Sequence, residues 1–156
     1  MNQPPAKARL TSRDESITFV LEASDREFPG IKDYWDGNWI LVRLMMEIPG
    51  LNIDFTDPCI RTDELETFLE DLKGLSIGHS LTAESSFSEP ILYINLQIPE
   101  PGSDIVLGRI DITLFSDEGA ASVAVEMDID YDAVEMFTQG IEDILREYPV
   151  VARETH

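Results

Sequence analysis

The chain has 156 residues and a mass of 17.6 kDa, and 31 acidic against 11 basic residues leave a formal net charge of −20. This charge excludes a general nucleic-acid binder, whose affinity would come from Lys and Arg meeting phosphates. It also excludes a protein that lies on an anionic membrane surface. A hydrophobic fraction of 43% is enough for one packed core, so the sequence predicts a single globular domain.

We expect a cytoplasmic protein. No apolar run approaches the roughly 18 to 20 residues of a membrane helix, and the first ten residues lack the apolar core of a secretory signal. The single cysteine, Cys59, cannot form an internal disulfide and is typical of a reducing compartment.

The acidity has two interpretations. Only three basic residues are lysines, and a surface poor in Lys and rich in carboxylates is what adaptation to high salt or selection for solubility produces. Alternatively, a charge this large steers a basic partner toward the protein by long-range attraction.

The first half of the sequence predicts strands followed by a helix. Residues 1–15 carry Pro4, Pro5 and polar positions without a period, so we expect a flexible N-terminal tail there. Alternating apolar positions predict strands at residues 16–22 and 39–48, and a hairpin partner that begins at Leu51 after the Pro49-Gly50 turn. A helix is expected from Thr62, which can cap it, until glycines at 74 and 78 end it.

The second half repeats neither the residues nor the spacing of the first. Alternation predicts four further strands, at residues 80–87, 91–98, 105–115 and 120–129, and a second helix from Asp130 to Tyr148. The predicted fold is α+β: a mainly antiparallel sheet of about six or seven strands with two helices packed on one face. Residues 16–150 form the expected single domain, and residues 151–156 a C-terminal tail.

The sequence holds little that could carry catalysis. His79 is expected in a loop, His156 ends the chain, and Cys59 has no histidine near it in sequence, so a buried, inert thiol is expected. Glu126, Asp128 and Asp130 share one side of a strand, which predicts a solvated face and not a catalytic pair. Calcium loops, Gly-rich phosphate loops and nucleophile elbows do not occur. We expect no enzyme activity, no cofactor and no metal, and a hydrolase that uses carboxylates alone is the weakest alternative.

Both tryptophans lie in one short segment, residues 33–39, which reads Asp-Tyr-Trp-Asp-Gly-Asn-Trp and follows Phe28-Pro29. One interpretation is a packing nucleus that closes an end of the sheet around the Asp-Gly turn. The other is that Tyr34 and Trp35 form an exposed aromatic anchor for a partner, since Tyr and Trp are frequent in interface hot spots.

The chain resembles the bacterial immunity proteins of the wall-associated toxin A system, the WapI family, over residues 16–149. The tryptophan segment is the most specific part of this resemblance. Weaker elements agree with it in order: Asp57-Pro58-Cys59-Ile60-Arg61-Thr62 before the first helix, Glu89-Pro90-Ile91-Leu92 at a strand, Ile129-Asp130 before the closing helix, and Tyr148-Pro149 at its end.

The resemblance implies a small cytoplasmic protein that protects its producer from a cognate toxin, carried at the C-terminus of a large contact-dependent protein. The toxins of this system include RNA-cleaving domains, which are typically basic. We therefore expect a non-enzymatic immunity protein that binds a basic toxin domain, with neither nucleic acid nor membrane as partner and with the oligomeric state open. The alternative is an acidic structural or scaffolding domain of a salt-adapted cytosol.

Two acidic surfaces compete for the partner. The first combines the exposed side of the first helix with the aromatic pair, and its residues are Tyr34, Trp35, Asp63, Glu64, Glu66, Glu70 and Asp71. The helix carboxylates are expected to point to solvent together, because the leucines and Phe68 between them belong to the core. The second is the flatter sheet face around Asp111, Glu126 and Asp128, where Ser, Thr and Ala dilute the charge. The sequence favours the first surface.

Overall fold

The computed structural model describes residues 4–152, and within them the order of elements is four strands and a helix, twice over. The first half consists of β1 (Lys7–Thr11), β2 (Thr18–Arg26), β3 (Trp39–Ile48), β4 (Leu51–Arg61) and α1 (Thr62–Ser76). The second half consists of β5 (Thr82–Glu84), β6 (Leu92–Gln97), β7 (Val106–Ser116), β8 (Gly119–Ile129) and α2 (Tyr131–Glu147). The topology therefore repeats although the sequence shows no repeat.

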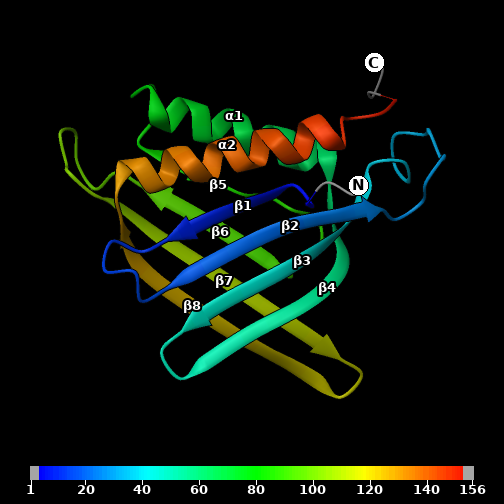
Figure 1. Cartoon of the computed structure of the whole chain (residues 1–156), viewed down its shortest axis with the longest axis horizontal. Helices are drawn as coiled ribbons and strands as arrows, with labels where there is room; N and C mark the ends of the chain where they lie inside the picture. Colours follow the sequence, from blue (N-terminus) through cyan, green and yellow to red (C-terminus); the bar gives the residue numbers. More distant parts are fainter. Residues whose placement is uncertain (1–3, 153–156) are drawn as a thin grey trace.

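The strands form two antiparallel sheets of four, in the orders β1-β2-β3-β4 and β5-β6-β7-β8. The α+β class is confirmed, but the single sheet of six or seven strands is wrong. One-sided alternation occurs whenever one face of a strand is covered, and it does not say whether helices or a second sheet covers it. Here the two sheets face each other and their strands cross, as Figure 1 shows.

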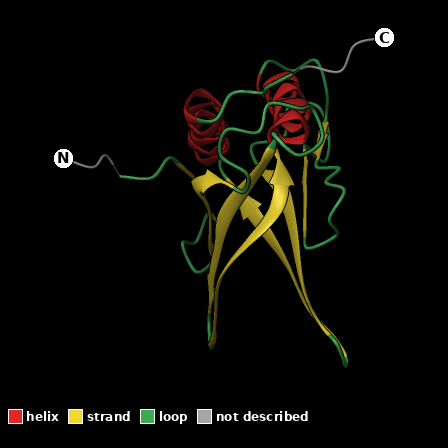
Figure 2. Cartoon of the chain, turned by 90° about the vertical axis from the view of Figure 1, so that its right-hand side faces the viewer, coloured by secondary structure: helices red, strands yellow, loops and turns green. Residues whose placement is uncertain are grey.

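The helices do not pack on one face of one sheet as expected. They lie side by side over one end of both sheets (Figures 1 and 2), with α2 against β1 and α1 against β5. Each helix thus packs against the first strand of the other half. Phe137 of α2 lies in the middle, with ring centroids 6.4 Å from both Phe19 of β2 and Phe68 of α1. One core joins the two halves.

A glycine allows the close approach of α2 to β1. A Cβ atom on Gly140 would lie 2.5 Å from the Cα atom of Ala8 and from the carbonyl oxygen of Lys7. Since real Cβ atoms do not approach backbone so closely, the helix can lie on this strand only with glycine at this position.

The expected N-terminal tail over residues 1–15 is wrong for its second half. β1 pairs with β2, and Ala8 and Leu10 are fully buried. Two apolar positions between charged ones are too few to show a period, so no strand could be predicted there. Residues 1–3 lie outside the described residues, as do residues 153–156 of the expected C-terminal tail and with them His156. None of the helices in the described part of the chain is long and apolar enough to cross a membrane.

Other strands begin or end at different residues from those expected, because turns interrupt the alternating pattern. The hairpin partner that begins at Leu51 continues through Pro58 to Arg61, opposite a register shift between Ile40 and Val42 of β3. The strand expected over residues 80–87 shortens to β5. The second helix matches its expected bounds closely, with Asp130 and Tyr148 as its flanking residues.

The β3–β4 and β7–β8 hairpins project from the end of the molecule opposite the helices, and their tips diverge (Figure 2). Both hairpins close with a two-residue turn, because Ile48 pairs with Leu51 and Ser116 with Gly119. Toward the tips their apolar residues become exposed, among them Leu51, Leu114 and Phe115.

Candidate interaction surfaces

The tryptophan turn (residues 33–39) is held by its own polar side chains. The Asp33 carboxylate accepts hydrogen bonds from the backbone N–H groups of Trp35, at 2.9 Å, and Asp36, at 2.8 Å. Gly37 cannot be replaced easily, since a Cβ atom there would lie 2.6 Å from the carbonyl oxygens of Asp33 and Ile31. The sequence pattern thus produces a compact turn directly before β3.

A buried asparagine ties this turn to two distant segments. The Asn38 amide nitrogen donates to the carbonyl oxygens of Tyr34, at 2.8 Å, and Val151, at 3.1 Å. Its carbonyl oxygen accepts from the Thr62 hydroxyl, at 2.9 Å, and from the Val151 N–H, at 2.8 Å. Thr62 is therefore not the cap that the sequence suggested: Arg61 occupies the N-cap position, and the Thr62 side chain holds α1 to the turn.

Arg61 is the centre of this region, and sequence reasoning gave it no role. Its side chain is 4% exposed, and its guanidinium carbon lies 4.8 Å from the ring centroid of Tyr34, 4.5 Å from that of Trp35 and 5.8 Å from that of Trp39. These distances allow cation–π attraction to all three rings. The available signal was the position of a basic residue between an aromatic turn and an acidic helix.

Two of the predicted site residues complete the environment of Arg61. The Asp63 carboxylate lies 3.2 Å from its Nε atom and also accepts a 2.8 Å hydrogen bond from the Tyr34 hydroxyl. The Arg61 Nη2 atom donates to the Tyr34 carbonyl oxygen at 2.6 Å. The structure therefore brings Tyr34, Trp35 and Asp63 together. The turn packs at its buried residues, and a role of the aromatic pair as an anchor for a partner stays a prediction. Asn38 and Gly37 are buried, whereas the Trp35 ring is 64% exposed beside its edge-to-face neighbour Tyr34.

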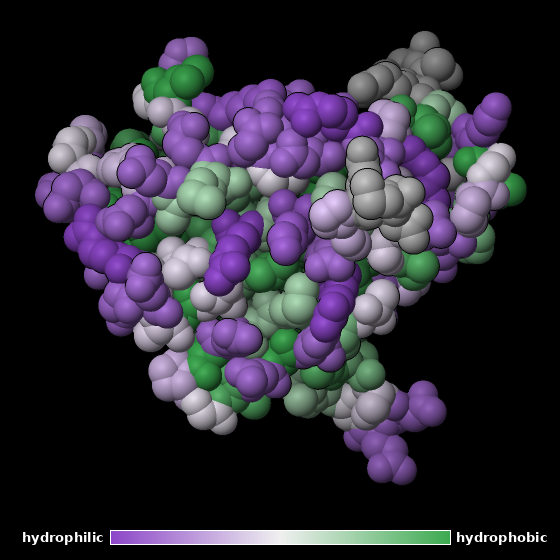
Figure 3. Space-filling model, in the orientation of Figure 1, coloured by the Kyte–Doolittle hydropathy of each residue, from purple (hydrophilic) through white to green (hydrophobic). Residues whose placement is uncertain are grey.

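The carboxylates of α1 do not all face solvent. Like Asp63, Glu64 forms hydrogen bonds within the protein: its carboxylate accepts from the hydroxyl and from the N–H of Ser88, the latter at 2.7 Å. These hydrogen bonds connect α1 to the loop before β6. Glu66 is half-buried, and only Glu70 and Asp71 are exposed. Figure 3 shows hydrophilic side chains dominating the surface over the two helices, with apolar residues gathered below them.

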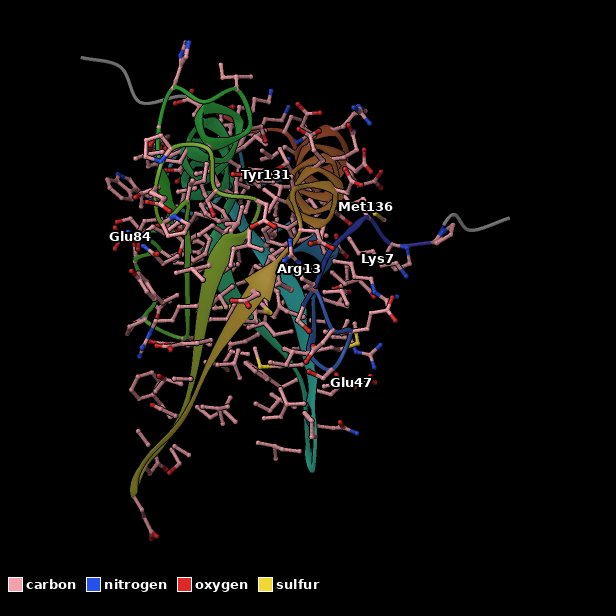
Figure 4. The ribbon with its side chains drawn as sticks, turned by 90° about the vertical axis from the view of Figure 1, so that its left-hand side faces the viewer. Lys7, Arg13, Glu47, Glu84, Tyr131 and Met136 are labelled. Carbon is pink, nitrogen blue, oxygen red and sulfur yellow. The ribbon has the colours of Figure 1, made fainter. Side chains whose placement is uncertain are left out.

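The competing sheet face carries basic residues among its acids. Arg109 of β7 lies 3.0 Å from the carboxylate of Asp111 and 3.1 Å from that of Glu126, and Asp128 follows along β8. A cavity of about 600 Å³ opens beside this face, between the β5-β6-β7-β8 sheet and the β1–β2 turn. Its lining includes Arg13, Asp14, Arg109 and Glu126. Figure 4 places Arg13 of that turn near Tyr131 at the start of α2. The mixture of charges makes this face less negative than the sequence alone implied.

The cysteine and the described histidine lie in different environments. Cys59 is buried, and this burial raises the pKa of its thiol to about 12, as expected for an inert cysteine. His79 is exposed in the loop after α1. Within residues 4–152 there is no cluster of three or more His, Cys, Asp or Glu side chains that could hold a metal ion. The features that stand out are an exposed tryptophan and exposed acidic side chains, which suit contact with another macromolecule.

Comparison with known proteins identifies the family. The model of the immunity protein WapI-like family matches residues 9–149, which is most of the chain. The chain belongs to this family. The resemblance drawn from the tryptophan turn is thereby confirmed, and family membership points to a toxin-neutralising role. Searches of curated proteins and of solved structures give no match.

Proposed function

We propose that this chain is a cytoplasmic, non-enzymatic immunity protein that binds and neutralises a basic, nuclease-type toxin domain. The observation that carries the proposal is the match of the WapI-like family model to residues 9–149. The net charge of −20 supports the finer statement about the partner. A nuclease domain presents Lys and Arg to phosphates, and an acidic protein can occupy the same surface.

The negative charge also favours the fast association with a basic toxin that immunity requires. A toxin must be captured before it acts, and electrostatic steering can raise association rate constants to about 10⁸ to 10⁹ M⁻¹s⁻¹ at low salt. Such rates depend on a concentrated patch of one sign. The middle of α1 provides one, since Glu70 and Asp71 are exposed on the same helix as the half-buried Glu66.

The proposed contact surface keeps the residues predicted from the sequence and divides their roles. Trp35 supplies exposed apolar area, and Glu66, Glu70 and Asp71 supply charge. Tyr34, Asp63 and Glu64 are fixed by hydrogen bonds within the protein, so their part is to hold Trp35 and the start of α1 in place. Rigid aromatic side chains flanked by charge are typical of interface hot spots.

An immunity role predicts that the gene immediately upstream encodes the cognate toxin. The test is the association kinetics of the purified chain with the C-terminal domain of the protein that this gene encodes. We expect Glu66→Lys combined with Glu70→Lys to slow association at least several-fold at low salt, and high salt to remove most of the difference. Asp132→Lys with Glu135→Lys on exposed positions of α2 is the matched control, because each replacement adds two charges and both double variants change −20 to −16. Equal rates in the two folded double variants would place the contact elsewhere.

A second candidate function is that of a scaffolding domain whose acidity reflects adaptation to a cytosol of high salt concentration. The scarcity of lysine favours this candidate. The two candidates differ in a simple pull-down. An immunity protein captures the toxin domain that is encoded beside its gene. A scaffolding domain does not capture a toxin domain.

A further inference from the structure

Each sheet has two outer strands, and three of these four are protected against pairing with another strand. β1 is covered by α2, whose Gly140 lies against Ala8. β5 is three residues long and packs against α1. β4 carries Asp54, Asp57 and Pro58 and lies opposite a register shift. Short length, charge, proline and irregular register are the usual means by which proteins block a free sheet edge.

β8 has none of these protections over most of its length. It is 11 residues long, its pairing with β7 runs without a shift, and its first seven residues are Gly-Ala-Ala-Ser-Val-Ala-Val. Within residues 4–152 the outer side of β8 receives one backbone hydrogen bond, from the N–H of Arg13 to the carbonyl oxygen of Asp128 at the far end. Figures 2 and 4 show the β7–β8 hairpin projecting away from the helices, with its tip apart from that of the β3–β4 hairpin.

The register identifies which backbone groups face outward. The Ser116–Gly119 pair closes a two-residue turn and so is hydrogen-bonded within the hairpin, and such pairs then occur at every second residue. The N–H and C=O groups of Ala120, Ser122 and Ala124 consequently point away from β7. Their side chains are small and exposed, so another strand can approach them closely.

We propose that the outer edge of β8, from Gly119 to Val125, is where an extended strand of the cognate toxin adds to the sheet. The inference rests on the proposed function and adds a second, directional contact to the acidic surface of α1. Backbone hydrogen bonds give such strand addition its affinity, and alternate side chains give it specificity. Seven residues at about 3.3 Å each offer an edge of roughly 23 Å.

Charge selects the occupant. The uncharged edge lies between carboxylates at both ends: Asp117 and Glu118 in the turn, and Asp128 together with Glu126, which is paired with Arg109, toward the base. A second copy pairing antiparallel would place the turn acids of one chain beside the base acids of the other, and each copy carries −20. A toxin strand with basic residues at its ends and apolar residues toward Val123 and Val125 matches this edge.

The test uses Ala124→Pro on β8 and Thr56→Pro on β4 as its matched control. Each residue lies five positions after the first residue of its strand, and each N–H points away from the sheet. Proline therefore removes one outward donor while leaving the hydrogen bonds to β7 or β3 in place. With the upstream toxin domain as probe, we expect Ala124→Pro to raise the dissociation rate at least tenfold and Thr56→Pro to change it less than twofold.

Amide hydrogen exchange on the unmodified chain gives the same answer without a variant. We expect the amides of Ala120, Ser122 and Ala124 to become protected on toxin binding, and those of Asp54 and Thr56 not to. If the toxin domain binds but these amides stay unprotected and Ala124→Pro dissociates normally, the β8 inference is overturned and the proposed function stands. If the unmodified chain does not bind the toxin domain, both fail. A dimer of the free chain that Ala124→Pro separates in sedimentation would identify a second copy as the occupant and overturn the inference.

Discussion

The two halves of the molecule share a topology and differ in what they do with it. In each, a meander of four strands leads into a helix, and the last two strands are joined by a two-residue turn. The junction between β4 and α1 is filled by Arg61 and three aromatic rings, and β4 is protected along its edge. The junction between β8 and α2 is held by an exposed arginine from the β1–β2 turn, and the edge of β8 is open.

This difference indicates a division of roles. The first half uses its unusual residues to fix the tryptophan turn and the start of α1, whereas the second half leaves backbone groups free for a partner. A common topology therefore does not imply that the two hairpins are equivalent in stability or in binding. Replacements at corresponding places in the two halves test the division.

The largest difference is expected between the two junction arginines. Arg61→Ala removes a buried cation and leaves Asp63 without its ion-pair partner, which should lower the free energy of unfolding by about 3 kcal/mol. Arg13→Ala removes a partly exposed pair with Asp130, 2.6 Å away, and should cost much less, because solvent screens exposed ion pairs. Urea unfolding followed by circular dichroism measures both, and equal losses would contradict the special role of the first junction.

The next difference concerns one glycine in each helix. Gly140→Ala should lower the free energy of unfolding by about 2 kcal/mol, because the new methyl group meets the backbone of β1. Gly74→Ala in α1 meets only the Ser80 side chain at 3.8 Å, an ordinary contact, so it should be neutral or slightly stabilising. Thermal unfolding of the two variants separates these outcomes. A Gly140→Ala protein as stable as the unmodified chain would show that α2 does not rest closely on β1.

The smallest effect is one of pH. Hydrogen bonds from Ser16 and Ser12 lower the pKa of Asp14 to about 2, from an ordinary value of 3.8. Because this pKa is depressed in the folded state, the carboxylate stabilises the β1–β2 turn above about pH 4, and this contribution is lost as the pH falls toward 2. Asp14→Asn should therefore be less stable than the unmodified chain at neutral pH, and the gap should close in acid.

Unfolding of Asp14→Asn and of the unmodified chain, measured between pH 2 and 7, checks whether the gap closes. A gap between Asp14→Asn and the unmodified chain that persists at pH 2 would mean that the turn does not depend on the ionised carboxylate.

Much of the fold could be predicted from periodicity. The alternation in β3, β7 and β8 and the apolar stripes of both helices are long enough to identify these elements. β1 could not be found, since Ala8 and Leu10 are its only buried positions. The division into two sheets could not be found either, because the choice between a helix and a second sheet as the covering layer is made by tertiary packing.

The candidate surface was predictable in its composition but not in its connections. The tryptophan turn was visible as a local cluster, and Trp35 is indeed exposed. The engagement of Asp63 by Tyr34 and of Glu64 by Ser88 joins residues more than 20 positions apart, so no local pattern indicates it. The open edge of β8 required knowledge of strand order, because a sequence does not say which strand lies outermost.

The central claim is that this chain neutralises a toxin by binding it, and growth of cells that express the upstream gene's C-terminal toxin domain tests it most directly. We expect growth to stop without the chain, to be restored by the unmodified chain and by Thr56→Pro, and to be restored less well by Ala124→Pro and by Glu66→Lys with Glu70→Lys. Cells that stop growing equally with and without the folded, unmodified chain would contradict the claim.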